Sequence, residues 1–146
     1  MKVNRLITHY KLLADTEIIL SDFYKTCRDG LQEKLGAILF QFPPKFTYTQ
    51  ERLQRIINSL DNSFTNVVEF RNASWWCENV FTQLSLHKII FCGISYPALP
   101  EFIDKRHETV YYRFHGVPKI YYSNYDEKKL QMLADSILSA ENIKQV

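Results

Sequence analysis

Polar side chains that could bind a ligand or transfer protons follow three apolar runs in this sequence. Gln41 ends the run AILFQ, Glu69 and Arg71 end the run NVVEFR, and Arg113 and His115 end the run VYYRFH. Successive side chains of a β-strand point to opposite faces, so residues two positions apart share a face. By this parity each run presents its polar groups on one face, and we expect all five side chains to converge.

The chemistry of such a group is that of an anion site with acid–base capacity. Arg71 and Arg113 could hold a carboxylate or a phosphate in a bidentate manner. Glu69 could act as a general base, ligate a metal or neutralise Arg71, and His115 could transfer a proton near neutral pH. We assign Glu69 and His115 as candidate catalytic residues and the two arginines with Gln41 as ligand-binding residues. A buried glutamate–arginine ion pair that only holds strands together is the alternative.

Two further residues are candidates for ligand contacts. His9, in the segment ITHY, could join the site if residues 2–6 end a strand, although a capping or packing role is the alternative. Trp75 follows the Glu69–Arg71 run directly, where an aromatic ring could stack on a sugar or a base. Packing of this ring against neighbouring elements is its alternative use.

Common cofactor and metal motifs are absent. The sequence contains no GxGxxG, P-loop, GxSxG or HExxH pattern, and only four glycines. Its cysteines, Cys27, Cys77 and Cys92, lack any metal-binding spacing, so we expect free thiols in a reducing compartment. We predict no metal site, and the sequence leaves the cofactor unknown.

The elements that must position these residues are alternating strands and helices. Near-continuous apolar runs predict strands over residues 37–42, 66–70, 88–94 and 109–114, and residues 2–6 could be the end of a fifth. Amphipathic spacing predicts helices from residue 16 to near 36 and over residues 47–60. Two more helices are expected after the candidate caps Ser74 and Ser123. In the last of them the expected inward-facing residues are Leu130, Leu133, Ala134 and Ile137.

This alternation predicts an α/β fold with parallel strands. A closed β/α barrel normally needs eight units and more than about 200 residues. Four or five strands therefore indicate either an open doubly wound sheet or part of a barrel.

Composition limits the kinds of partner. The chain has 146 residues, enough for one domain, and 18 basic against 16 acidic residues give a net charge of +2. This balance does not indicate nucleic-acid binding, which usually requires a basic excess or stripe. No apolar run approaches the roughly 20 residues that span a bilayer, and no signal peptide is apparent. We expect a soluble cytoplasmic protein without a membrane partner.

Several segments in series resemble one protein family. LITHYK, LGAILFQFPPKF, NVVEFRNASWW, FCGISYPALP and VYYRFHGVPKIYYSNY, in this order, are similar to the YecE-like family, also called domain-of-unknown-function family 72. The resemblance implies a TIM-type β/α barrel whose molecular function is not established. It covers residues 1–146 as a single but incomplete domain, because full-length members carry additional strands on both sides. Two unpaired sheet edges would follow, and with them a capacity for self-association.

Taken together, these features predict a partial TIM-type barrel with a site for an anionic or phosphorylated ligand at the carboxyl ends of its strands. Two alternatives remain open. One is a nucleic-acid-binding or nucleic-acid-processing module, and the other is a truncated remnant without independent activity.

Overall fold

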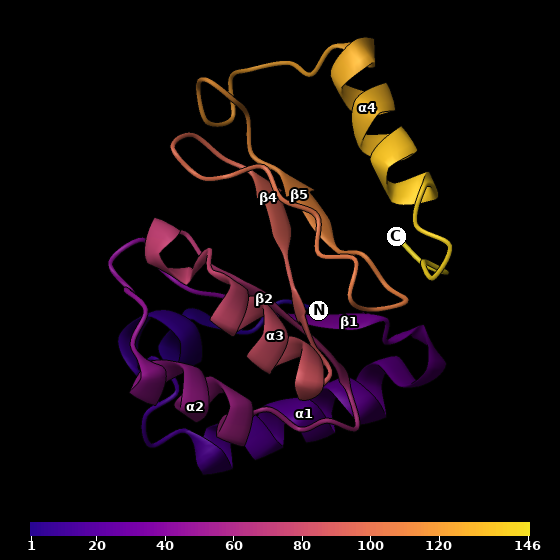
Figure 1. Ribbon diagram of the computed structural model, residues 1–146. Helices are drawn as coiled ribbons and strands as arrows, with labels where there is room; N and C mark the ends of the chain where they lie inside the picture. Colours follow the sequence, from indigo (N-terminus) through magenta and orange to yellow (C-terminus); the bar gives the residue numbers. More distant parts are fainter.

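The computed structural model describes all 146 residues, and every strand pairing in it is parallel (Figure 1). One sheet has the order β1-β2-β3, and a second sheet pairs β4 with β5. The strands are β1 (Ala37–Gln41), β2 (Thr65–Glu69), β3 (Ile89–Phe91), β4 (Gly93–Ser95) and β5 (Tyr112–Phe114). The predicted α/β class is confirmed, and the strands form two open sheets rather than a closed barrel.

The two sheets are joined through one extended segment. β3 and β4 are separated only by Cys92, whose N–H donates to the carbonyl of Val68 at 2.8 Å, whereas Gly93 N–H donates to Tyr111 at 2.9 Å. The predicted strand 88–94 therefore pairs with β2 through its first half and with β5 through its second half. As a result, strands that follow one another in sequence also lie next to one another in space.

Short bridges extend the sheets at both edges. Met1–Val3 pairs with β1 through a parallel bridge at Lys2, where Val3 N–H donates to the carbonyl of Leu39 at 2.9 Å. At the other edge, Thr109 bridges Gln145. The expected fifth strand is thus limited to a bridge, because the chain turns into a π-helix at Leu6–Tyr10. Self-association through these edges stays a prediction.

Four α-helices accompany the strands, and their bounds are α1 (Glu17–Leu31), α2 (Gln50–Ser59), α3 (Glu78–Leu86) and α4 (Glu127–Leu138). Short 3₁₀ turns cover Gln32–Lys34 and Ala73–Trp75. None of these helices has both the length and the apolar character that crossing a membrane requires. In Figure 1, α1, α2 and α3 group around the three-stranded sheet, and α4 lies beyond β5.

The helix caps predicted at Ser74 and Ser123 were wrong. Thr49 caps α2, because its extended backbone lets the hydroxyl accept from Arg52 N–H, and Asp126 caps α4 by accepting from Lys129 N–H. The hydroxyl of Ser123 instead donates to the carbonyl of Lys119 at 3.0 Å, inside a turn. Ser74 lies in the 3₁₀ turn, three residues before the N-cap position of α3 at Cys77.

The two faces of the three-stranded sheet pack differently. One face meets the helices in a large apolar cluster that includes Phe40, Val68 and Phe91. The other face carries a smaller cluster of Leu39, Val67, Ile90, Cys92 and Ile94. Gln41 and Glu69 have the parity of the smaller cluster, so their side chains emerge above it at the carboxyl ends of the strands.

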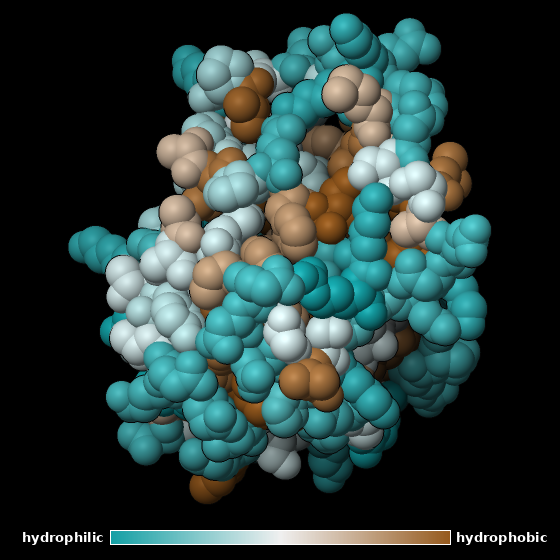
Figure 2. All heavy atoms as spheres, viewed as in Figure 1, coloured by the Kyte–Doolittle hydropathy of each residue, from teal (hydrophilic) through white to brown (hydrophobic).

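The last helix is less buried than its periodicity predicts. Of the four expected inward-facing residues only Ile137 is buried, and Leu130 is 44% exposed. A hollow between β5 and α4, lined by Phe114, Met132 and Leu133, separates the helix from the strand. The space-filling view shows hydrophobic atoms exposed in this region (Figure 2).

Candidate functional site

A buried carboxylate forms the centre of the candidate site. Glu69, the last residue of β2, has no exposed surface. Its Oε1 accepts a hydrogen bond from Nε of Arg71, and its Oε2 accepts one from Nη1 of Arg113 at 2.5 Å. Each oxygen is therefore occupied by a different guanidinium, one from the loop after β2 and one from β5.

His115 completes this strand-end cluster of Glu69, Arg71, Arg113 and His115. Its Nε2 lies 3.4 Å from Oε1 of Glu69 and 3.2 Å from Nη2 of Arg71. Backbone bonds fix the residue, since His115 N–H donates to Ser95 and the His115 carbonyl accepts from Tyr121 N–H at 2.7 Å. Parity predicts that five side chains converge, and the structure brings four of them together in this cluster. Whether they bind or transform a ligand stays a prediction.

The turn behind His115 requires glycine. Gly116 has a φ of +94°, and a Cβ there would lie 2.7 Å from the carbonyl oxygen of Lys119. Such a distance is too short for a carbon atom, and this φ is unfavourable for any residue with a side chain. Gly116 therefore sets the tight turn that holds His115 over the end of β5.

Electrostatics keep Glu69 ionised. Burial by itself disfavours the charged form, but the hydrogen bond from His115 and the charges of Arg71 and Arg113 outweigh it and lower the pKa of Glu69 to about 2. A carboxylate with so low a pKa is a weak proton acceptor at neutral pH. Of the three roles open to Glu69, the geometry therefore favours neutralising and orienting the arginines over general-base catalysis.

The two arginines differ in exposure. The side chain of Arg71 is 9% exposed, and its Cζ lies 4.5 Å from the centre of the Tyr96 ring. The side chain of Arg113 is 31% exposed, and its Nε and Nη2 have no hydrogen-bond partner in the protein. Arg71 is thus held on three sides, whereas Arg113 presents free donors to solvent.

A second chain of polar contacts lies beside the cluster. Gln41 is 9% exposed, and its Oε1 accepts from Nζ of Lys2 at 3.0 Å. Its Nε2 donates to the Phe42 carbonyl at 2.9 Å and lies 3.5 Å from Nε2 of His9. The structure therefore places Gln41 and His9 in contact, as expected if His9 joins the site, although His9 sits in a π-helical turn and not at a strand end.

Sequence reasoning missed Lys2 as a member of this group. Its ammonium reaches Gln41 because Met1–Val3 pairs beside β1, with Lys2 opposite Leu39. Burial and the charge of Arg113 lower the pKa of Lys2. The parity rule that selects Gln41 would have selected Lys2 if the bridge to β1 had been known.

Trp75 is placed in the core and not at the site. It is fully buried, its ring stacks on Phe70 at a centroid distance of 4.0 Å, and its Nε1 donates to the Phe46 carbonyl at 2.7 Å. The 3₁₀ turn over Ala73–Trp75 directs the ring inward. This burial contradicts the predicted stacking of Trp75 on a ligand and agrees with the packing alternative.

The group as a whole carries excess positive charge. Lys2, Arg71 and Arg113 supply three cationic groups, against the single carboxylate of Glu69. No cluster of three or more histidine, cysteine, aspartate or glutamate side chains is arranged to hold a metal ion. Whether this group binds an anion stays a prediction.

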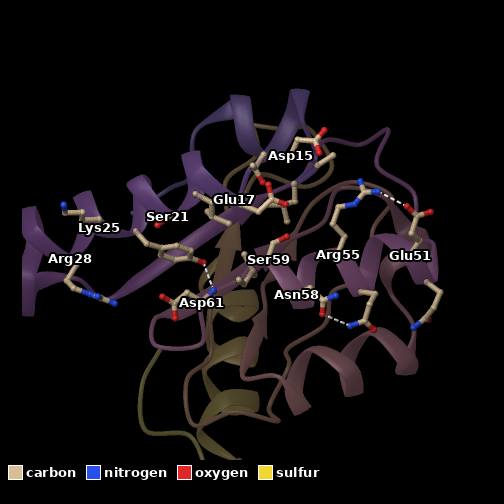
Figure 3. Close-up of a pocket in the computed structure, with 18 of the residues that line it drawn as sticks. Asp15, Glu17, Ser21, Lys25, Arg28, Glu51, Arg55, Asn58, Ser59 and Asp61 are labelled. Carbon is tan, nitrogen blue, oxygen red and sulfur yellow. Dashed lines mark hydrogen bonds and ion pairs between the residues drawn. The ribbon is translucent and has the colours of Figure 1, made fainter.

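A separate groove is lined mainly by residues of α1 and α2 (Figure 3). Two pairs of its polar side chains contact each other, Arg55 with Glu51 at 2.8 Å and Gln54 with Asn58 at 2.9 Å. It brings together no group of the kind found around Glu69. We therefore locate the candidate site at the strand ends.

Comparisons with known proteins agree on one family. The model of the family described as "Protein of unknown function DUF72" matches residues 1–146. A DUF72 family protein from Thermotoga maritima superposes with a TM-score of 0.85 at 22% identity, covering 99% of this chain and 62% of that one. A DUF72 family protein from Enterococcus faecalis V583 gives 0.78 at 19% identity, covering 100% and 64%. No curated protein matches the sequence. The chain thus spans less than two thirds of either solved relative.

Proposed function

Because this chain belongs to the DUF72 family, whose function is unknown, we propose its function from the local chemistry: the strand-end cluster binds an anionic ligand of the phosphate or carboxylate class. The observation that carries the proposal is that the two carboxylate oxygens of Glu69 accept hydrogen bonds from two different arginines. One carboxylate orients two guanidinium groups and neutralises only one of their charges. The second charge is left for a ligand.

The arrangement of donors supports this proposal. Nε and Nη2 of Arg113 are free, and guanidinium donors match the spacing of carboxylate and phosphate oxygens. Lys2 adds a third cation that is exposed to solvent. Glu69 and Arg71 are buried, and burial strengthens their interaction relative to water, because the low local dielectric screens charges less. A purely structural ion pair would not need the additional cations.

The fold supports the same location. We propose that the two sheets form an arc of a TIM-type β/α barrel, since consecutive strands are spatial neighbours and all pairings are parallel. In such barrels ligands bind at the carboxyl ends of the strands, which is where Gln41, Glu69 and Arg113 lie. We do not propose a nucleic-acid function, because the burial of Trp75 removes the stacking platform expected for it.

Thermal unfolding in phosphate tests the proposal. At ten times its Kd, phosphate should raise the free energy of unfolding by about 1.4 kcal/mol relative to chloride at equal ionic strength. Arg113→Ala should lose this stabilisation. Arg55→Ala is a matched control, because Arg55 lies on α2 and pairs only with exposed Glu51. Full phosphate stabilisation of Arg113→Ala would contradict the proposal.

A further inference from the structure

His9 is held in one orientation by a buried neighbour. It lies in the π-helical turn Leu6–Tyr10, where Thr8 has no exposed surface. Ile7 N–H donates to the side-chain oxygen of Asn4 at 3.2 Å, and the Thr8 hydroxyl donates to the Asn4 carbonyl at 3.1 Å. These bonds fix the turn that presents the imidazole to Gln41.

The same bonds determine the tautomer of His9. The Thr8 hydroxyl donates its only hydrogen to the Asn4 carbonyl. Toward Nδ1 of His9, which lies 2.9 Å away, the hydroxyl oxygen can therefore only accept a hydrogen bond. Nδ1 therefore carries the proton of the neutral ring. The lone pair of this imidazole is then on Nε2, which faces the site.

The orientation of Gln41 agrees with this tautomer. The Lys2 ammonium can only donate and the Phe42 carbonyl can only accept, so Oε1 of Gln41 must face Lys2 and its Nε2 must face Phe42. The second hydrogen of this amide then points at Nε2 of His9 across 3.5 Å. Such a distance is at the long limit of a hydrogen bond, so the lone pair remains available to a better donor.

The neutral state of the ring is also favoured. Burial and the charges of Arg5, Lys2 and Arg71 all lower the pKa of His9. The imidazole is thus uncharged at neutral pH, in a group that otherwise consists of cations around one carboxylate. It is the acceptor of the group that is not already committed to a strong donor.

We infer that Nε2 of His9 accepts a hydrogen bond from a hydroxyl group of the ligand, so that the site takes a hydroxylated phosphate ester. This inference rests on the proposed anion site. Gln41 connects the residue expected to bind the phosphate with the residue expected to bind the hydroxyl, because its amide contacts Lys2 at one end and His9 at the other. A ligand whose phosphate lies against Lys2 and Arg113 would place a nearby hydroxyl within reach of His9.

Nitrogen-15 NMR of the imidazole rings tests the tautomer directly. At pH 7 the spectrum of His9 should show a protonated Nδ1 and an unprotonated Nε2. Thr8→Val, which removes the acceptor of the Nδ1 proton at little change in volume, should reduce that preference. A ring with its proton on Nε2, or one charged at pH 7, would overturn the inference.

Calorimetry with three probes separates the inference from the proposed function. Wild-type protein should bind inorganic phosphate, and it should bind glycerol 1-phosphate about five-fold more tightly than propyl phosphate, as one added hydrogen bond would give. His9→Phe should bind the two esters equally, whereas the control His87→Phe should keep the preference. Equal binding of the two esters by wild type overturns this inference alone. If inorganic phosphate and both esters fail to bind, the proposed function is overturned as well.

Discussion

Arg113 on β5 binds Glu69 on β2 with an Nη1–Oε2 distance of 2.5 Å, across 44 positions of sequence. The two residues belong to different sheets, and β2 and β5 pair with other strands. The ion pair therefore connects the sheets at their carboxyl ends and also holds a partly exposed guanidinium at the candidate site. Structural and ligand-binding roles coincide in this contact, so the variants that test them must separate stability from binding.

Loss of Arg71 should destabilise the fold more than loss of Arg113. Arg71→Ala removes a 9% exposed partner and leaves Glu69 buried with one guanidinium, which should cost about 3–5 kcal/mol. Arg113→Ala should cost about 1–2 kcal/mol, because its 31% exposed side chain can be replaced by water. Urea unfolding of both variants measures the two costs. A larger cost for Arg113→Ala would contradict this account of the pair.

Stability should depend on the ionisation of Glu69. The pKa of this carboxyl is about 2 in the folded protein, below the ordinary glutamate value of 4.5. A lowered folded-state pKa contributes stability that is present above the unfolded pKa and is lost as pH falls toward the folded one. The shift corresponds to about 3 kcal/mol.

Urea unfolding from pH 6 to pH 2 measures this contribution as a difference between wild type and Glu69→Gln. The advantage of wild type should be constant near pH 6 and should shrink below about pH 4.5, since the variant cannot titrate at this position. If the advantage is the same at pH 2.5 as at pH 6, Glu69 is not the buried anion that we describe.

Replacing Trp75 should affect stability alone. Trp75→Phe removes the hydrogen bond to the Phe46 carbonyl and part of the stacking on Phe70, which should cost about 2 kcal/mol. Phosphate affinity should not change, because the ring lies in the core. Calorimetry at a temperature where the variant is folded checks this. A loss of phosphate affinity would mean that Trp75 contributes to the site after all.

Lys2 should strengthen anion binding in a salt-dependent way. Lys2→Gln should weaken phosphate binding about three-fold at low ionic strength, and the difference should disappear near 0.5 M salt, because exposed charges are screened. Lys34→Gln is the control, since Lys34 is also exposed but lies before the start of β1. Equal effects of the two substitutions would mean that net charge, and not the position of Lys2, is responsible.

Parity identified the strand-end cluster but not the neighbouring Lys2, because it depends only on strand geometry. Glu69 and Arg113 could be assigned to a shared face without knowledge of register, since side chains alternate in every strand. Lys2 could not, because a single bridge leaves no apolar run in the sequence. The inward turn of Trp75 depends on a 3₁₀ turn that propensity does not specify.

For the helices too, the sequence pattern predicted local structure better than tertiary packing. Apolar spacing correctly predicted a helix within residues 47–60, and Leu53, Ile56 and Ile57 form the buried face of α2. It overestimated the burial of α4, where Leu130 stays exposed, because the pattern states which face could be buried but not what covers it. The cap of α4 was misassigned because Ser123 and Asp126 lie close together and both residue types favour the N-cap position, whereas Cys77 at the N-cap of α3 makes no side-chain cap bond.

The most direct test of the anion site is a crystal structure of this chain soaked in tungstate, a tetrahedral oxyanion that scatters anomalously. We predict an anomalous peak within hydrogen-bond distance of the free donors of Arg113, near Lys2, in wild type, and its loss in crystals of Arg113→Ala. A peak at another surface only, or one that persists in Arg113→Ala, would contradict the proposal that the strand-end cluster binds an anion.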